Sequence, residues 1–230
     1  VLWYQGCDDA NNYGTALQYE SQMTTLINQY RNVFGRKDLP FLYVQLARWP
    51  NYQYTQNVRE AQRTTLGNTN LHDSSNVAMT VSLDTDKGTS ALIHPLGKDI
   101  LGARMAAQYL AMEDGTTVPN GPLIERARHT ANGAIALSFR NGTASRLKAM
   151  QPNYSKTASA IAPNYKSAPK AVNATIRGNQ VLLTAADGSI LNDLNAMSQV
   201  RYLFSGNPKC ASILYNDFNL PASPFITIVE

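Results

Sequence analysis

The run Phe41-Leu42-Tyr43-Val44-Gln45-Leu46 is almost continuously apolar and follows Pro40. A short apolar run without alternation is typical of a strand that is buried on both faces. Residues 77–83 form a second run of this kind, and residues 1–4 form a third. We therefore predict three buried strands in the first half of the chain.

Between and after these runs, the spacing of apolar residues changes to that of helices. Residues 16–34 are predicted to form a helix that Gly35 ends, and residues 55–66 and 97–112 are predicted to form two more. Alternating strands and helices predict an α/β fold with a parallel sheet covered by helices. The predicted inward residues are Leu17, Met23, Leu26, Ile27, Tyr30, Val33 and Phe34 in the first helix, and Ile100, Leu101, Met105, Leu110 and Met112 in the third.

After about Gly121 the pattern becomes one of short β segments separated by Gly, Asn and Pro turns. We predict an α/β domain over residues 1–120 and a small antiparallel β-rich region over residues 121–230 that packs on it. Residues 141–170 are low in apolar content, so a loop or irregular insertion is expected there. The predicted strands are residues 135–139, 172–176, 181–184, 200–204 and 225–229.

Composition bounds the location and the partners of the protein. Among 230 residues, only 16% are charged, and this charge-poor surface favours a secreted or lumenal location (lysosomal, extracellular or periplasmic). Sequons at Asn141, Asn153 and Asn173 fit glycosylation in such a location. No apolar run approaches about 18 residues, so no membrane association is expected.

The basic residues are unevenly distributed. Nine Lys and Arg side chains and no acidic residue occur from Arg126 up to Asp187. A polyanion-binding surface is one interpretation. The favoured one is a solvated basic face, because the aromatic pattern of a stacking platform is missing. We therefore predict no nucleic-acid partner.

Candidate catalytic residues lie where two of the predicted strands end. Ligand sites of parallel sheets lie at the carboxyl ends of the strands. Gln5 and Gly6 follow the first strand, and a glutamine amide with a glycine N–H can donate to developing negative charge as an oxyanion hole. His94 comes after the third strand and its loop, and a nearby carboxylate would make it a general base. Asp86 is the favoured carboxylate, and Asp84 is the weaker alternative. No Cys/His cluster has metal-ligand spacing, so no metal is predicted.

Many separated motifs of the chain have the order and spacing of one family. The motifs are Trp3-Tyr4-Gln5-Gly6, Tyr30-Arg31-Asn32-Val33-Phe34, Leu39-Pro40-Phe41, Val44-Gln45-Leu46, Arg59-Glu60-Ala61-Gln62, Ile93-His94-Pro95 with Lys98, Gly121-Pro122, Val200-Arg201-Tyr202, Leu214-Tyr215-Asn216 and Leu220-Pro221-Ala222-Ser223-Pro224-Phe225. Over essentially its whole length, the chain resembles the sialate O-acetylesterases.

The resemblance implies a flavodoxin-like SGNH-hydrolase fold, a three-layer α/β/α sheet of which this chain holds part. It also implies hydrolysis of acetyl esters on sialic acids or, as in relatives, on plant polysaccharides such as xylan. The implied mechanism is that of a serine esterase, without metal or organic cofactor. By this resemblance Gln5 is an oxyanion donor and His94 the general base. The family's serine lies in a Gly-Gln-Ser-Asn-like motif upstream of Val1, so we expect an N-terminal segment or partner chain to supply it.

Two departures from the family pattern support an alternative. Cys7 stands where the family usually has a glutamate, and Ser90-Ala91-Leu92 offers no acidic residue before His94. The alternative is a catalytically inactive carbohydrate-binding or scaffolding protein of the same fold. Cys7 is disfavoured as a replacement nucleophile, because it follows the oxyanion glycine and would attack from the wrong side of the site.

Overall fold

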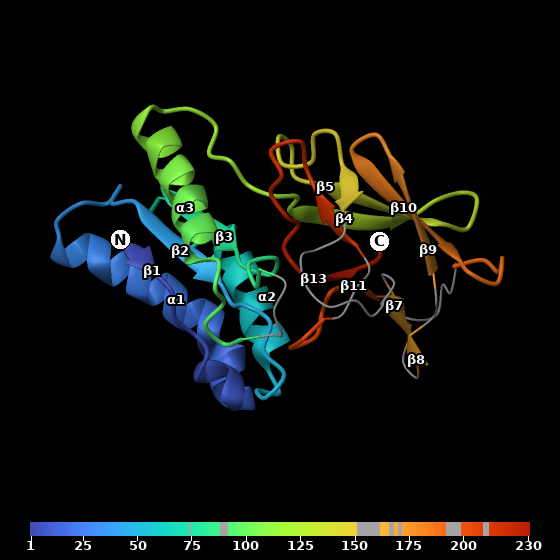
Figure 1. Cartoon of the computed structure of the whole chain (residues 1–230), viewed down its shortest axis with the longest axis horizontal. Coiled ribbons are helices and arrows are strands. Elements are labelled where there is room, and N and C mark those ends of the chain that lie inside the picture. Colours follow the sequence, from blue (N-terminus) through green and yellow to red (C-terminus); the bar gives the residue numbers. More distant parts are fainter. Residues whose placement is uncertain are drawn as a thin grey trace. The chain divides into compact units, whose positions relative to one another are not determined.

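The structure is a computed structural model that describes residues 1–73, 75–87, 92–150, 162–165, 168–169, 172–191, 199–208 and 212–230. The chain divides into two compact units (Figure 1). The first contains Val1–Asn120 together with Ser205–Asn207. The second contains Gly121–Phe204 and Pro208–Glu230.

The first unit contains a parallel three-stranded sheet, with strands β1 (Leu2–Trp3), β2 (Phe41–Gln45) and β3 (Val77–Val81) in that order. Leu42 of β2 is opposite Leu2 on one side and Ala78 on the other. Every residue of β2 and β3 is buried, as expected for strands covered on both faces. The predicted parallel sheet is confirmed.

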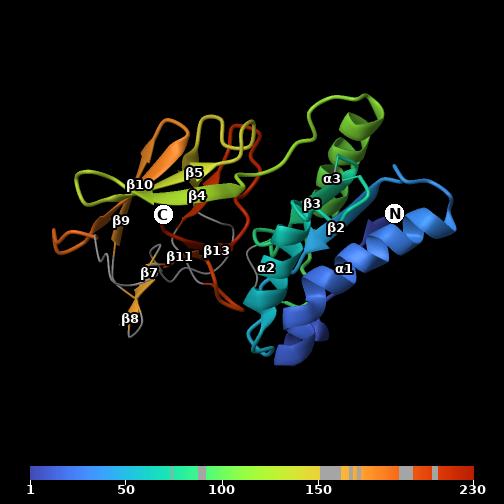
Figure 2. The ribbon, with the colours of Figure 1, turned by 180° about the vertical axis from the view of Figure 1, so that it is seen from behind.

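Helices cover both faces of this sheet (Figures 1 and 2). They are α1 (Tyr13–Val33), α2 (Thr55–Thr65) and α3 (Lys98–Glu113). On one face, Leu42 and Val44 form a hydrophobic cluster with Leu101 and Met105 of α3. On the other face, the Tyr43 hydroxyl donates to the main-chain carbonyl of Gln62 in α2 at 2.6 Å. Because successive strand residues point to opposite faces, this is the predicted three-layer α/β/α arrangement.

Helix α1 begins three residues earlier than predicted. The Asn12 side chain accepts hydrogen bonds from the main-chain nitrogens of Gly14 (2.8 Å) and Thr15 (3.4 Å) and so caps the helix. Its end agrees with the prediction, because Gly35 has a φ of 65° in the left-handed region.

The buried face of α1 differs from the prediction. Leu17, Val33 and Phe34 are exposed by 59%, 82% and 62%. Met23 and Ile27 are buried as predicted, but apolar character alone did not define the rest of the buried face, because polar side chains with partners also lie inside. The Arg31 guanidinium, for example, donates to the carbonyls of Leu39 (3.2 Å) and Asp73 (2.7 Å). The buried residues are Ala16, Tyr19, Met23, Thr24, Ile27 and Arg31.

Helix α3 shows the same effect. Leu101 and Met105 are buried as predicted, but Leu110 is 58% exposed. Gln108 is buried instead, and its Oε1 accepts a 2.7 Å hydrogen bond from the Thr80 hydroxyl of β3.

The second unit consists of small antiparallel sheets, as predicted. One has the order β4-β5-β10-β9, the next β13-β11-β7-β8, and the last pairs β12 with β6. The strands are β4 (Ile124–His129), β5 (Ile135–Phe139), β6 (Lys148–Met150), β7 (Ala162–Tyr165), β8 (Ala168–Pro169), β9 (Val172–Arg177), β10 (Gln180–Ala185), β11 (Gln199–Tyr202), β12 (Ile213–Tyr215) and β13 (Phe225–Ile228).

Several of these strands were not predicted. In β4, a register shift between Ile124 and Arg126 breaks the alternation of buried and exposed residues, and the strand carries charged side chains. Strands β6, β7 and β8 fall within the predicted loop 141–170. The rest of that prediction, over residues 151–161, 166–167 and 170, lies outside the described residues, as does the sequon asparagine Asn153.

No helix in the described ranges combines the length and the apolar character that a membrane span requires.

We predict that Leu42→Ala lowers the free energy of unfolding by about 2 to 5 kcal/mol, because it leaves a cavity in the cluster beneath α3. The matched control is Leu110→Ala on the exposed side of α3, which should change the free energy by less than about 0.5 kcal/mol. Urea unfolding followed by circular dichroism measures both. Equal losses in the two variants would contradict the assignment of the core.

Candidate active site

The predicted site residues lie in loops that follow the parallel strands. Gln5 and Gly6 come directly after β1, and Asp86 belongs to the loop after β3. His94 belongs to the segment that enters α3. The carboxyl ends of parallel strands share one edge of the sheet, which is where ligands bind in such folds.

The Gln5-Gly6 turn is tightly constrained by Tyr19 of α1. The Tyr19 hydroxyl lies 3.0 Å from the Gln5 carbonyl oxygen, to which it donates. Gly6 is buried with a φ of 117°, and a Cβ at this position would lie 2.9 Å from the Tyr19 hydroxyl. Only glycine fits here without strain.

The exposed Gln5 side chain is also positioned. Its Nε2 donates to an Asp9 carboxylate oxygen at 2.6 Å. A glutamine amide has two N–H donors, so the bond to Asp9 uses one of them.

The two candidate acids are each engaged with an arginine. Asp86 is buried, and its Oδ2 accepts a hydrogen bond from Arg48 Nε at 2.7 Å and forms an ion pair with Nη2 at 2.5 Å. Asp84 accepts two hydrogen bonds from Arg104, at 2.8 and 2.7 Å. Burial raises the pKa of Asp86 above its ordinary value, although the Arg48 guanidinium favours the charged form. Its assignment as the partner of His94 stays a prediction.

His94 is an exposed side chain in a loop that is anchored at its end. Pro95 beside it is buried. Gly97 donates its N–H to the Thr85 carbonyl at 2.8 Å, and a Cβ on Gly97 would lie 2.6 Å from that oxygen. Residue 97 must therefore be glycine for the His94 loop to dock against the loop that carries Asp84 and Asp86. Residues 88–91 between them lie outside the described part.

Arg59 and Gln62 of α2 organise the strand ends, a role that the sequence did not reveal. The Arg59 side chain is fully buried and donates to the carbonyls of Leu46 (2.8 Å) and Ala47 (2.5 Å). Gln62 Oε1 accepts from Leu46 N at 2.9 Å, and its Nε2 donates to the Gln5 carbonyl at 3.3 Å. The Arg59-Glu60-Ala61-Gln62 motif is the feature of the sequence from which these two residues could have been found.

A distant tripeptide, Ser205–Asn207, belongs to the same edge of the first unit. Arg59 also donates to the carbonyls of Ser205 (2.7 Å) and Gly206 (2.9 Å). Arg48 Nη1 donates to Asn207 Oδ1 at 3.1 Å, and Trp49 N donates to the Gly206 carbonyl at 2.9 Å. The loop after β2 is thereby fixed from two sides.

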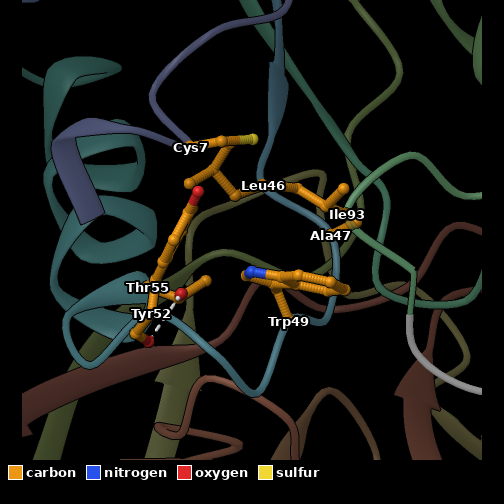
Figure 3. A pocket seen from close by; sticks show the side chains of 7 residues that line it. All are labelled: Cys7, Leu46, Ala47, Trp49, Tyr52, Thr55 and Ile93. Carbon is orange, nitrogen blue, oxygen red and sulfur yellow. Dashed lines mark hydrogen bonds between the residues drawn. The ribbon is translucent and has the colours of Figure 1, made fainter. Parts of the chain in front are cut away.

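A small apolar pocket opens among these loops (Figure 3). Cys7, the neighbour of Gly6, and Ile93, the neighbour of His94, both line it. Figure 3 shows the Trp49 indole across from Cys7, with the Tyr52 ring along one side and Leu46 and Ile93 along the other. The complete lining is Cys7, Leu46, Ala47, Trp49, Tyr52, Thr55 and Ile93.

Ionisable groups near the pocket are shifted toward their neutral forms. Burial raises the pKa of the Cys7 thiol, and the charge of Lys98 opposes this shift only in part. Burial likewise raises the pKa of Tyr4 to about 12. The Lys98 ammonium lies 4.2 Å from the centroid of the Tyr4 ring, a cation–π contact. Within the described ranges, no group of three or more His, Cys, Asp or Glu side chains could hold a metal ion.

Comparison with known proteins agrees with this class of fold and site. A family model described as carbohydrate esterase, sialic acid-specific acetylesterase, matches residues 1–111. This stretch contains the sheet, the Gln5-Gly6 turn and the His94 loop. Residues 1–111 therefore resemble the sialic acid-specific acetylesterase family of carbohydrate esterases.

A solved structure extends the likeness to the second unit. A carbohydrate acetylesterase from Xanthomonas citri matches with a TM-score of 0.77 and 29% sequence identity. The match covers 99% of this chain and 49% of that one, so the chain spans about half the length of this relative. No curated protein matches the chain in sequence.

We predict that Arg48→Met lowers the free energy of unfolding by about 3 to 5 kcal/mol, because it leaves the buried Asp86 carboxylate without its guanidinium. The same change should raise the pKa of Asp86 further, so the loss should become smaller as the pH falls and Asp86 is protonated. Urea unfolding at several pH values measures this.

The matched control is Arg36→Met, which removes an exposed ion pair with Asp38 and should leave the urea midpoint nearly unchanged. A loss for Arg48→Met that does not exceed the control would show that the Arg48–Asp86 pair is not buried as described.

We predict that Cys7 reacts slowly with iodoacetamide at pH 7, because its raised pKa keeps it a thiol. The rate should keep rising as the pH passes 9, the ordinary pKa. Mass spectrometry of Cys210→Ser protein reports on Cys7 alone, with an unfolded sample as the control. Rapid labelling at pH 7 in the folded sample would mean an activated thiolate.

Proposed function

We propose that this chain contributes the general base and part of the oxyanion hole to the active site of a carbohydrate O-acetylesterase. One observation carries the proposal: the direct neighbours of Gly6 and His94 line the same pocket. This supports the proposal that the candidate oxyanion donor and the candidate general base act at one small space near the ends of the parallel strands. The family match over residues 1–111 supports acetyl esters on sugars as the substrate class.

The proposed mechanism is that of a serine esterase. A serine hydroxyl attacks the acetyl carbonyl carbon, and His94 accepts its proton. The Gly6 N–H and the second N–H of the Gln5 amide donate to the oxyanion of the tetrahedral intermediate. Protonated His94 then returns its proton to the leaving sugar oxygen. Water, activated by His94, attacks the acetyl-serine and releases acetate.

We propose that a segment or partner chain beyond these 230 residues supplies the serine. The first unit has exposed apolar side chains on the edge strand β1 and on α1, where Leu2 is 71% and Val33 is 82% exposed. A further segment that covered these side chains would remove apolar surface from water, which favours the proposal. The unpaired edge of β1 is also a template for a further strand. The half-length match to the Xanthomonas relative supports the same proposal.

The acid that orients His94 is proposed to be Asp86. The bond between Gly97 and Thr85 ties the two loops together next to Asp86. The alternative acid, Asp84, is held by Arg104 as Asp86 is held by Arg48, so the arginine pairs do not distinguish the two acids. Sialic acid O-acetyl esters are the proposed substrate, and acetylated plant polysaccharides are the next candidate.

An inactive carbohydrate-binding or scaffolding protein is the second proposal. It is favoured by Cys7, an uncharged thiol at the position where the family usually has a glutamate. In this case the pocket and the loops would be kept for sugar binding without turnover. Binding of O-acetyl sialic acid by a whole protein that does not hydrolyse it would support this alternative.

We predict that His94→Ala, in the whole protein that includes the serine, lowers kcat for p-nitrophenyl acetate and O-acetyl sialic acid by about 10²- to 10⁴-fold, since the general base is lost. His72→Ala is the matched control, because His72 is also exposed but lies in a loop before β3, and it should keep the wild-type rate. Equal rates for wild type and His94→Ala would refute the esterase mechanism.

A further inference from the structure

We propose that the pocket between Cys7 and Ile93 is an acyl subsite that receives the methyl group of the acetyl ester and excludes longer acyl chains. This inference rests on the proposed esterase function and deepens it, since it assigns the feature that restricts the substrate to acetyl esters.

The position of the pocket supports this assignment. In an ester, the acyl methyl group is bonded directly to the carbonyl carbon. A carbonyl oxygen that accepts from the Gly6 N–H brings its methyl group within reach of the residues around Gly6, and the pocket lies among these. Cys7 forms one wall of the pocket, and Ile93, the residue before the general base, forms another.

The size of the pocket sets the limit. Its cavity volume is about 10 Å³, which is the space of roughly one water-sized group. A methyl group is the smallest alkyl group of an acyl ester and needs the least room, whereas the longer propionyl or butyryl chain has to extend through the open side or displace a wall.

The walls are held in place by the hydrogen bonds described above. Leu46 and Ala47 are fixed through their carbonyls by the buried Arg59 guanidinium. The main-chain N–H of Trp49 donates to the Gly206 carbonyl. The Trp49 ring contacts the Tyr52 ring edge-on, with the centroids 6.3 Å apart. Rigid walls discriminate between groups by size, because relaxation around a larger group is costly.

The chemistry of the lining excludes the polar parts of a sugar. Its side chains are mainly apolar, and the hydroxyl of Thr55 donates to the Tyr52 carbonyl at 3.1 Å. The lining offers few polar side-chain groups, among them the Trp49 indole N–H and the Tyr52 hydroxyl, so a sugar ring with several hydroxyls would lose most of its water without replacement. The acetyl methyl group is the part of an acetylated sugar that gains from entering.

The test compares p-nitrophenyl acetate, propionate and butyrate as substrates of the whole protein. For wild type, we expect kcat/KM to fall about 10- to 200-fold from acetate to propionate, the usual discrimination for one methylene in an apolar pocket. Ile93→Ala enlarges the pocket and should raise the propionate-to-acetate ratio at least about tenfold. Ile190→Ala removes the same atoms from a 66% exposed residue and should leave the ratio at the wild-type value.

A second variant changes the pocket in the opposite direction. Cys7→Leu fills it and should lower kcat/KM for acetate, with folding checked by circular dichroism. A wild type that accepts butyrate as well as acetate, or an Ile93→Ala ratio equal to that of Ile190→Ala, would overturn the acyl subsite alone. If wild type hydrolyses none of the three esters, the proposed function fails, and the acyl subsite fails with it.

Discussion

The guanidinium of Arg59 donates hydrogen bonds to main-chain carbonyls in two segments that are far apart in the sequence. The acceptors are Leu46 and Ala47 in one segment and Ser205 and Gly206 in the other. A buried cation is costly unless its donors are satisfied. Here the donors are satisfied by loops that would otherwise leave their carbonyls buried and unpaired. Arg59 therefore fixes the path of the chain after β2, and with it the position of Trp49 and of the pocket wall.

Gln62, one turn further along α2, links the loop after β2 to the loop after the neighbouring strand, β1. It accepts from Leu46 N after β2 and donates to the Gln5 carbonyl after β1. Tyr19 holds the same carbonyl from the side of α1. The Gln5-Gly6 turn is thus held in place by two helices, α1 and α2. Preorganised donors are the most effective means of stabilising an oxyanion, because they need not be reoriented during the reaction.

The positions of strands and helices were predicted from the sequence more accurately than the side of each helix that is buried. Runs 41–46 and 77–83 were correctly assigned as buried strands, because a strand covered on both sides has no polar face to confuse the pattern. The buried side of α1 was predicted only in part: Met23 and Ile27 are buried, but Tyr19 and Arg31 were missed because their polar groups find partners in other segments. Strand β4 was missed because a bulge interrupts its alternation. For the candidate site, Gln5, Gly6 and His94 could be named from strand-end positions and from the family pattern. The roles of Arg59 and of Ser205–Asn207 depend on contacts between residues almost 150 positions apart, and no local pattern encodes these.

The inclusion of Ser205–Asn207 in the first unit has a consequence for how this chain can be divided. A boundary drawn at Asn120 looks natural in the sequence, yet a fragment cut there would lose two of the carbonyls that Arg59 binds and the amide that Arg48 binds. Such a fragment would keep every strand and helix of the α/β layers. It would still lack the contacts that hold the loops at the carboxyl ends of its strands. In evolution, the β-rich region could not be exchanged for another module unless the replacement brought an equivalent tripeptide.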